Sequence, residues 1–217
     1  MNRPIILVVL LVAMGFGLWA AVAPLSAVRL PGNNQFYEPQ QPIAYSHRLH
    51  AGELGINCLY CHGAAEHSRR AGVPAASTCM NCHKYVTSTL SAKRAEDELS
   101  QKENRSPRRI VSAELAKLYD AMGLDEQMKP DPKRKQHPIE WTRIHHLPSF
   151  VSFDHSRHVN AGVTCQTCHG PIETMERVRQ IPDLTMGWCV NCHRDVNTTG
   201  VNGKPVQAST DCISCHQ

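Results

Sequence analysis

The sequence predicts a mainly α-helical and irregular fold. One N-terminal transmembrane helix is expected first, followed by short helices and loops packed around bulky prosthetic groups. The chain begins with a long apolar run, strand signals are sparse, and aromatic residues are only 6% of 217 residues while Cys (10) and His (13) are abundant. So few large apolar side chains cannot build a sizeable core alone. The net charge of +4 is modest and scattered, so nucleic acid is not an expected partner.

Residues 5–23 form the apolar run and contain no charged residue. As a helix at about 1.5 Å per residue, this run spans roughly 30 Å, the thickness of a bilayer core. A cleaved signal peptide is the alternative, because residues 21–23 have a small-x-small pattern. Pro24 directly after that site disfavours cleavage, and Arg3 favours an inside N-terminus. We therefore expect residues 1–30 to be a single-pass anchor in a bacterial inner membrane, with the bulk of the chain on the periplasmic face.

Every cysteine belongs to one of five copies of Cys-x-x-Cys-His, numbered here as motifs 1 to 5 in chain order. The copies are Cys58, Cys61 and His62; Cys79, Cys82 and His83; Cys165, Cys168 and His169; Cys189, Cys192 and His193; and Cys212, Cys215 and His216. Two thiols at this spacing add to the two vinyl groups of one haem, and the next imidazole reaches the iron. The pattern predicts five covalently bound haem c groups, each with a proximal histidine.

Zinc sites and disulfides are the alternative uses of these cysteines. Zinc sites use paired Cys-x-x-Cys units or distant histidines, and five units leave one unpaired. Disulfides suit an outer-face location. Neither alternative explains a histidine directly after every pair. No copy ends in lysine, so the substituted proximal ligand of some multihaem nitrite reductases is absent.

The chain also contains an internal duplication. Tyr45-x-His47-x-x-His50 precedes motif 1 and Phe153-x-His155-x-x-His158 precedes motif 3, each by six or seven residues. Each copy then holds a second motif ending in Asn-Cys-His and a basic residue. Such repeats predict stacked modules with a shared interior. We expect an anchor (residues 1–30), a first dihaem module (31–85), a connecting segment (86–140) and a second module with three haems (141–217).

Histidines three positions apart lie on one side of a helical turn, so both can point into a haem cluster, and the aromatic residue can pack on a porphyrin. The arrangement resembles the multihaem type III cytochromes c. That resemblance implies that His47 ligates the haem of motif 1 and His155 that of motif 3. It implies that His50 and His158 reach other haems, which the sequence does not identify. Exposed surface histidines are the alternative.

Five irons need a fifth distal ligand, and His145 is the favoured residue because it leads directly into the second module. His146 is its immediate competitor. Met175 and Met186 lie between haem motifs, and a thioether ligand would raise the potential of one haem. Simple apolar packing is the alternative for both methionines. His67 and His137 are expected to be solvated.

The connecting segment contains no cysteine. Residues 87–109 are mostly charged and sustain no apolar stripe. A short helix is expected next, capped by Ser112 and ended by Gly123. Its apolar face repeats at helical spacing and would serve either packing against the haem modules or docking to a partner subunit. This face holds Leu115, Leu118, Tyr119 and Met122.

Most of the chain apart from residues 86–135 resembles the pentahaem cytochrome c subunits of alternative complex III, a bacterial quinol-oxidising membrane complex. The residues that carry the resemblance are the anchor, the segment 58–84, the segment Trp141–Pro148 and the run Leu184–Cys189. It implies partner subunits that include an iron–sulfur protein, and a mono-haem cytochrome c or small copper protein as electron acceptor. A similar haem pattern occurs in related quinone reductase complexes, where electrons run the other way.

An electron relay without substrate chemistry is the expected function, because eight histidines outside the motifs can saturate five irons. A multihaem reductase of small nitrogen or sulfur compounds is one alternative, and it needs an iron with a vacant position. A stand-alone, membrane-anchored quinol dehydrogenase is the other. Quinol oxidation by the isolated subunit would favour the latter.

Overall fold

The computed structural model describes residues 3–22 and 33–216, and this part of the chain consists of helices and irregular segments. Its β-type pairings are three isolated bridges. The predicted fold class is therefore confirmed. In chain order the elements are α1 (Arg3–Val22), the π-helix η1 (Arg48–Glu53), α2 (Cys58–Cys61), the 3₁₀-helix η2 (Gly63–Glu66), α3 (Ala76–His83), α4 (Leu90–Lys102), α5 (Ala113–Ala121), α6 (His155–Asn160), α7 (Cys165–His169), the 3₁₀-helix η3 (Ile172–Thr174), α8 (Met186–Thr199) and α9 (Cys212–Cys215).

Helix α1 is long and apolar enough to cross a membrane. Its segment Pro4–Ala21 has a mean hydropathy of 2.4, and none of it is buried against the rest of the protein. A run of exposed Leu, Val and Ile side chains in water is unfavourable, so this helix needs an apolar surrounding. A signal sequence meets the same criteria as an anchor. The residues 21–23 that suggest a cleavage site lie partly outside the described residues.

Each Cys-x-x-Cys-His motif lies on a helix: motif 1 on α2, motif 2 on α3, motif 3 on α7, motif 4 on α8 and motif 5 on α9. One helical turn brings residues three apart to the same side, so both thiols of a motif can reach one group. Two of these helices have side-chain N-caps. Asn57 Oδ1 accepts from the Leu59 amide at 2.8 Å, and Thr185 Oγ1 accepts from the Trp188 amide at 3.3 Å.

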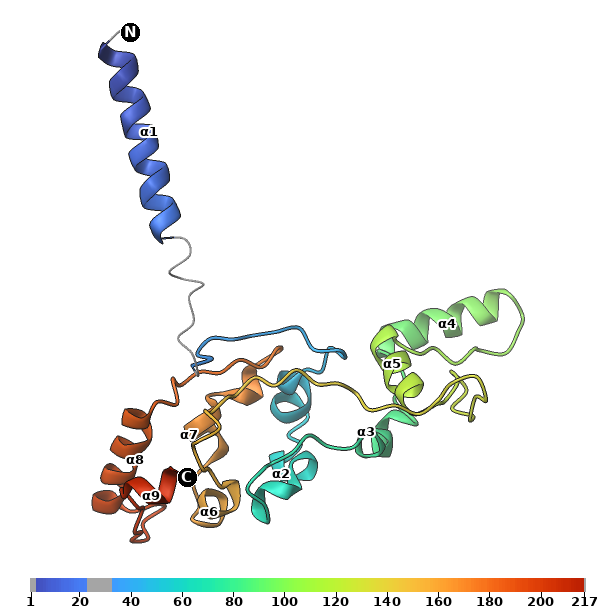
Figure 1. The fold of residues 1–217 in the computed structure, drawn as a ribbon. Coiled ribbons are helices and arrows are strands. Elements are labelled where there is room, and N and C mark those ends of the chain that lie inside the picture. The colour runs from blue at the N-terminus through green and yellow to red at the C-terminus, as the bar shows by residue number, and fades with distance from the viewer. Residues whose placement is uncertain (1–2, 23–32, 217) are drawn as a thin grey trace.

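The motif helices are spread along the molecule between two different ends (Figure 1). Helices α4 and α5 lie at one end and α8 and α9 at the other, with α2, α6 and α7 between them. Helix α6 packs on η2, which joins the two modules at motif 1. Asn160 Nδ2 donates to the Glu66 carbonyl oxygen at 3.0 Å across this junction.

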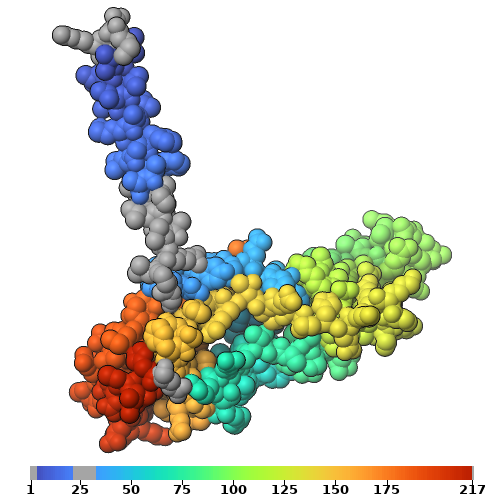
Figure 2. Space-filling model, in the orientation of Figure 1, coloured from blue at the N-terminus to red at the C-terminus, as the bar shows by residue number. Residues whose placement is uncertain are grey.

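Three extended segments lie side by side over the modules, and Figure 2 shows the first two crossing one face in blue and yellow. The Thr142 amide donates to Gln41 Oε1 at 2.9 Å, and Gln41 Nε2 donates to the Thr142 carbonyl oxygen at 3.0 Å. The Phe36 amide donates to the carbonyl oxygen of Gln180 at 2.7 Å. Gln180 is fully buried, so these polar contacts fasten the segments together.

The connecting segment contains one helix that the sequence pattern predicted and one that it did not. Helix α5 has the expected cap, because Ser112 Oγ accepts from the Leu115 amide at 3.3 Å. Its apolar face packs towards α3, and Tyr119 is fully buried. This agrees with the packing interpretation rather than with a face left open for a partner. Helix α4 was missed because it has no apolar stripe. Strong helix formers and the Thr89 cap maintain it instead.

Side chains alone form almost no apolar core in the described residues. The buried hydrophobic residues are Ala65, Leu118, Tyr119, Ala121 and Met175. The accessible surface is 15596 Å², whereas a compact monomer of this mass exposes roughly 10,000 Å². The isolated helix α1 contributes part of this excess. The modules therefore depend on interior material other than side chains, as the composition predicted.

Candidate haem-binding site

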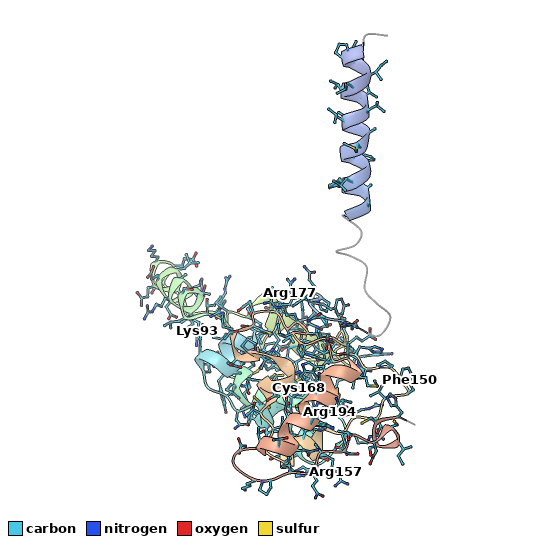
Figure 3. The ribbon with its side chains drawn as sticks, turned by 90° about the vertical axis from the view of Figure 1, so that its left-hand side faces the viewer. Lys93, Phe150, Arg157, Cys168, Arg177 and Arg194 are labelled. Carbon is cyan, nitrogen blue, oxygen red and sulfur yellow. The ribbon has the colours of Figure 1, made fainter. Side chains whose placement is uncertain are left out.

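The ten thiols are free, and seven or more atoms of chain separate each motif from the next, so they do not form a compact metal cluster. In the described part of the chain, no three His, Cys, Asp or Glu side chains converge in a way that would hold a bare metal ion. The zinc and disulfide alternatives therefore find no support in the geometry. Figure 3 shows Cys168 of motif 3 within the bulk of the molecule, with Phe150 and Arg157 at its edge.

The histidines that end motifs 1, 2 and 4 have one ring nitrogen fixed by the backbone. The carbonyl oxygens lie at the Nδ1 atoms as follows: Gly72 for His62 at 2.8 Å, Val86 for His83 at 2.8 Å, and Ser209 for His193 at 2.5 Å. Because a carbonyl oxygen can only accept, each Nδ1 carries the proton. The unprotonated Nε2 is then free to bind iron, which is the usual arrangement of a metal-binding histidine.

Three of the predicted distal histidines are held in the same way. The Nδ1 atoms of His50 and His158 each lie 2.8 Å from the carbonyl oxygen four residues earlier in the chain. The Nδ1 atom of His155 lies 2.9 Å from the carbonyl oxygen of Arg69, in the first module. These contacts again leave Nε2 as the available ligand atom.

Predicted distal and proximal histidines face each other in pairs. The ring centres of His50 and His83 are 6.0 Å apart, and those of His158 and His193 are also 6.0 Å apart. Two imidazoles that bind one metal at roughly 2 Å each hold their ring centres about 6 Å apart. The sequence left the partners of His50 and His158 open. The structure brings each to the second motif of its own module.

The histidines that precede these pairs lie near the first motif of each module. The rings of His155 and His169 are nearly parallel, with centres 6.4 Å apart. Burial lowers the pKa of His47 to about 4, and the nearby imidazoles of His62 and His50 lower it further. The Nδ1 atom of His47 is buried and has no hydrogen-bond partner among the described residues. A neutral imidazole is the form that binds iron.

The two modules repeat this geometry closely. Tyr45 stacks on His50 with ring centres 4.4 Å apart, and Phe153 stacks on His158 at 4.6 Å. Both aromatic rings also meet the first histidine edge-on at 4.8 Å. The aromatic residue of the repeated element thus fixes the orientation of both imidazoles. Burial, together with the thiols of motifs 1 and 2, raises the pKa of Tyr45 to about 12.

The fifth distal ligand stays a prediction. At motif 5 it is the ring of Phe150 that stacks on His216, with centres 5.8 Å apart. His145 Nε2 lies 3.2 Å from the Nδ1 atom of His169. The amide of His146 donates to Gln180 Oε1 at 3.4 Å. The two methionine candidates differ: Met175 is 7% exposed and Met186 is 70% exposed. His67 and His137 are exposed, as expected.

Thiols of different motifs lie within electrostatic reach of one another, and these neighbours give a spatial order. Burial raises the pKa of Cys79 and of Cys165, and each is raised further by a thiol of motif 1. Burial raises the pKa of Cys168 to about 11, with Cys192 and Cys189 of motif 4 adding to the rise. For Cys189, burial is followed by Cys215 of motif 5. The spatial order of the motifs is therefore 2, 1, 3, 4, 5.

These observations fit haem in the predicted positions. Imidazole pairs stand at the right separation, their Nδ1 atoms are tied back, and paired thiols lie on single helical turns. The interior lacks an apolar core of its own. Comparison with known proteins decides the class. Residues 151–217 match the family of cytochrome c7 and related cytochrome c. This segment belongs to the multihaem cytochromes c, and it contains motifs 3, 4 and 5.

A second comparison extends over both modules. The chain is 24% identical over 228 residues to a protein named menaquinone reductase, multiheme cytochrome c subunit, from Nitratidesulfovibrio vulgaris (strain Hildenborough). The alignment covers 96% of this chain and 87% of that protein. The cytochrome c7 match and this relative agree with haem c as the cofactor and electron transport as the general role.

Sequence reasoning did not find the backbone acceptors or the ring of Phe150. The carbonyl oxygens leave no trace in residue types, because every residue carries one. A signal for Phe150 was available: it lies five residues before His155, in the segment that enters the second module. Its proximity to His216 was not readable, because 66 positions separate the two residues.

Proposed function

We propose that this chain is a pentahaem, membrane-anchored electron-transfer cytochrome c that relays electrons within a quinone-linked membrane complex. The observation that carries the proposal is the facing of imidazoles whose Nδ1 atoms are tied to backbone carbonyls. Two such pairs, His50 with His83 and His158 with His193, have ring centres 6.0 Å apart. An iron with imidazoles on both sides has no open position for a substrate.

Each haem, when bound, supplies one-electron chemistry. The residues of the chain do the rest. The ten cysteines of the motifs hold the groups covalently, and the histidines that end the motifs act as proximal ligands. His47, His50, His155 and His158 act as distal ligands. The stacked rings of Tyr45 and Phe153 fix the orientation of the distal imidazoles.

The order 2, 1, 3, 4, 5 makes the relay linear. Motifs 2 and 5 are its two ends, and motif 1 meets motif 3 where the modules join. The contact of His155 Nδ1 with the carbonyl oxygen of Arg69 supports an intimate junction, because a predicted ligand of one module is held by the backbone of the other. Electrons would therefore enter near one end and leave near the other. The boundaries proposed above, at residues 30, 85 and 140, separate the anchor, the modules and the connecting segment.

We further propose that the complex is quinol-oxidising and resembles alternative complex III. It would contain an iron–sulfur subunit and deliver electrons to a mono-haem cytochrome c or small copper protein on the periplasmic face of a bacterial inner membrane. The similarity to a menaquinone reductase subunit favours a second candidate with the opposite direction, from a periplasmic donor to menaquinone. Helix α1 supports membrane attachment in both cases.

The test uses the complex purified from its native membrane through a tag on the full chain. Denaturing mass spectrometry of this subunit is expected to give five covalently attached haems. Zinc in their place, or fewer than five, would contradict the pentahaem proposal. Adding menaquinol to the oxidised complex is expected to reduce the haems and then an added mono-haem cytochrome c. Reduction only by a reduced periplasmic donor, followed by menaquinone reduction, would favour the second candidate.

The enzyme alternative has its own test on the same material. A haem with an open position binds carbon monoxide and shows a high-spin spectrum. We expect the intact complex to lack both signs. A stoichiometric high-spin haem would instead support a multihaem reductase, and quinol oxidation by the separated subunit would support a stand-alone dehydrogenase.

A further inference from the structure

The proximal candidate of motif 3 differs from the others in what holds its Nδ1 atom. The Nδ1 atom of His169 lies 3.2 Å from the Nε2 atom of His145. The two rings are nearly perpendicular, at 79°, with centres 4.3 Å apart. This is too close for an iron to lie between the two imidazoles, since two ligands of one metal hold their ring centres about 6 Å apart. The contact has the geometry of a hydrogen bond between side chains.

The internal duplication provides a comparison within the same chain. His62 occupies the position in the first module that His169 occupies in the second. Its Nδ1 donates to the carbonyl oxygen of Gly72 at 2.8 Å. A side-chain imidazole has thus replaced a backbone carbonyl as the acceptor in one of two repeated sites.

The opposite side of His169 is already occupied by the predicted distal ligand. The ring of His155 lies nearly parallel to it, with centres 6.4 Å apart, at the separation expected across a metal. The Nδ1 of His155 is bound to the carbonyl oxygen of Arg69, so its Nε2 is available. His145 therefore is not needed as a ligand of this iron, and its Nε2 is engaged elsewhere.

Only one proton can lie between the two nitrogens. If His169 binds iron through Nε2, its Nδ1 carries the proton and donates it to His145 Nε2. His145 must then be neutral, which its surroundings favour: burial lowers its pKa to about 4, and the imidazole of His155 lowers it further. A hydrogen bond at this place raises the basicity of a metal-binding imidazole.

We propose that His145 is a positioning residue for the proximal ligand of motif 3 and not the fifth distal ligand. It accepts the Nδ1 proton of His169, fixes the tautomer and orientation of that ring, and makes it a stronger donor to iron. A stronger donor favours the ferric state. The third haem then has a lower potential than it would have without His145. The inference rests on the proposed haem ligation by His169.

The experiment compares three variants in the purified complex. His145→Leu removes the acceptor, His145→Gln retains an oxygen that can accept, and His67→Leu changes an exposed histidine as the matched control. Haem content by mass, the spin state by electron paramagnetic resonance and a potentiometric titration are measured for each. Together they separate the haem count, the ligation and the potential.

For His145→Leu we expect five haems, no new high-spin signal and one haem with a raised potential. Its ratio of reduced to oxidised form at a fixed ambient potential should rise by up to about tenfold, equal to 59 mV for one electron. His145→Gln should restore most of the original potential, and His67→Leu should change nothing. Because His145→Leu can also weaken folding, His145→Gln serves as the folded reference.

A new high-spin haem in either His145 variant would overturn the inference, because it would identify His145 as an iron ligand. Unchanged potentials in a five-haem His145→Leu protein would overturn it as well. A wild-type subunit without haem at motif 3 would instead contradict the proposed function. The two failures are therefore distinguishable.

Discussion

Replacing Tyr119 by phenylalanine removes one hydroxyl group and keeps the buried ring. Tyr119 is fully buried in α5, and its hydroxyl donates to the carbonyl oxygen of His83 at 2.6 Å. His83 ends motif 2, so this bond joins the connecting segment to a haem-binding helix. A hydrogen bond of this kind contributes about 1 kcal/mol, and an acceptor left without a partner adds a further penalty. We expect Tyr119→Phe to lower the free energy of unfolding by about 1–2 kcal/mol.

For a chain of this size, such a loss corresponds to a fall in Tm of roughly 3–6 °C. Thermal unfolding of the haem-loaded protein, followed by the haem absorbance of the whole subunit, is the assay. Tyr85→Phe is the matched control, because Tyr85 is 72% exposed two residues beyond the same helix and should leave Tm unchanged. Equal changes in both variants, or no change for Tyr119→Phe, would refute the argument that this bond attaches the connecting segment to motif 2.

Two further predictions concern the connecting segment and motif 3. Glu96 is 8% exposed, and hydrogen bonds from Arg105 and the Arg108 amide lower its pKa from 4.5 to about 2. Its stabilisation is therefore complete above pH 4.5 and is lost as the pH falls towards 2. Glu96→Gln should flatten urea stability over this window, and exposed Glu98→Gln should not. Gly170 has a φ of +70°, and an added Cβ would lie 2.6 Å from Ile181 Cγ1. Gly170→Ala should therefore cost about 1–3 kcal/mol. The equivalent Gly63→Ala has open space and should leave Tm unchanged, so equal losses would contradict the strain argument.

Local chemistry made much of this protein predictable. The Cys-x-x-Cys-His motifs are covalent requirements of haem attachment, so five copies could be recognised without a fold. Helix α5 was predicted because its Ser112 cap and its apolar spacing both lie within one short stretch. The repeated aromatic-x-His-x-x-His element was recognised for the same reason.

Helix α4 shows where that reasoning stops. Its buried residues are Glu96 and Ser100 rather than leucine or valine. Its stability comes from an ion pair between Glu96 and Arg105, nine positions apart, and from helix propensity. A pattern search for an apolar face cannot find such a helix. The charge of residues 87–109 therefore suggested a segment without a packed face.

The sequence by itself determined the number of haem attachment motifs, the apolar N-terminal helix and the mainly helical, irregular class. Each follows from residues that are neighbours along the chain. Only the tertiary structure decided that His50 faces His83, that His158 faces His193 and that the motifs follow the order 2, 1, 3, 4, 5. It also brought His145 to the Nδ1 atom of His169. These relations depend on the direction of side chains from separate segments, and the spacing of residues in one dimension does not contain that information.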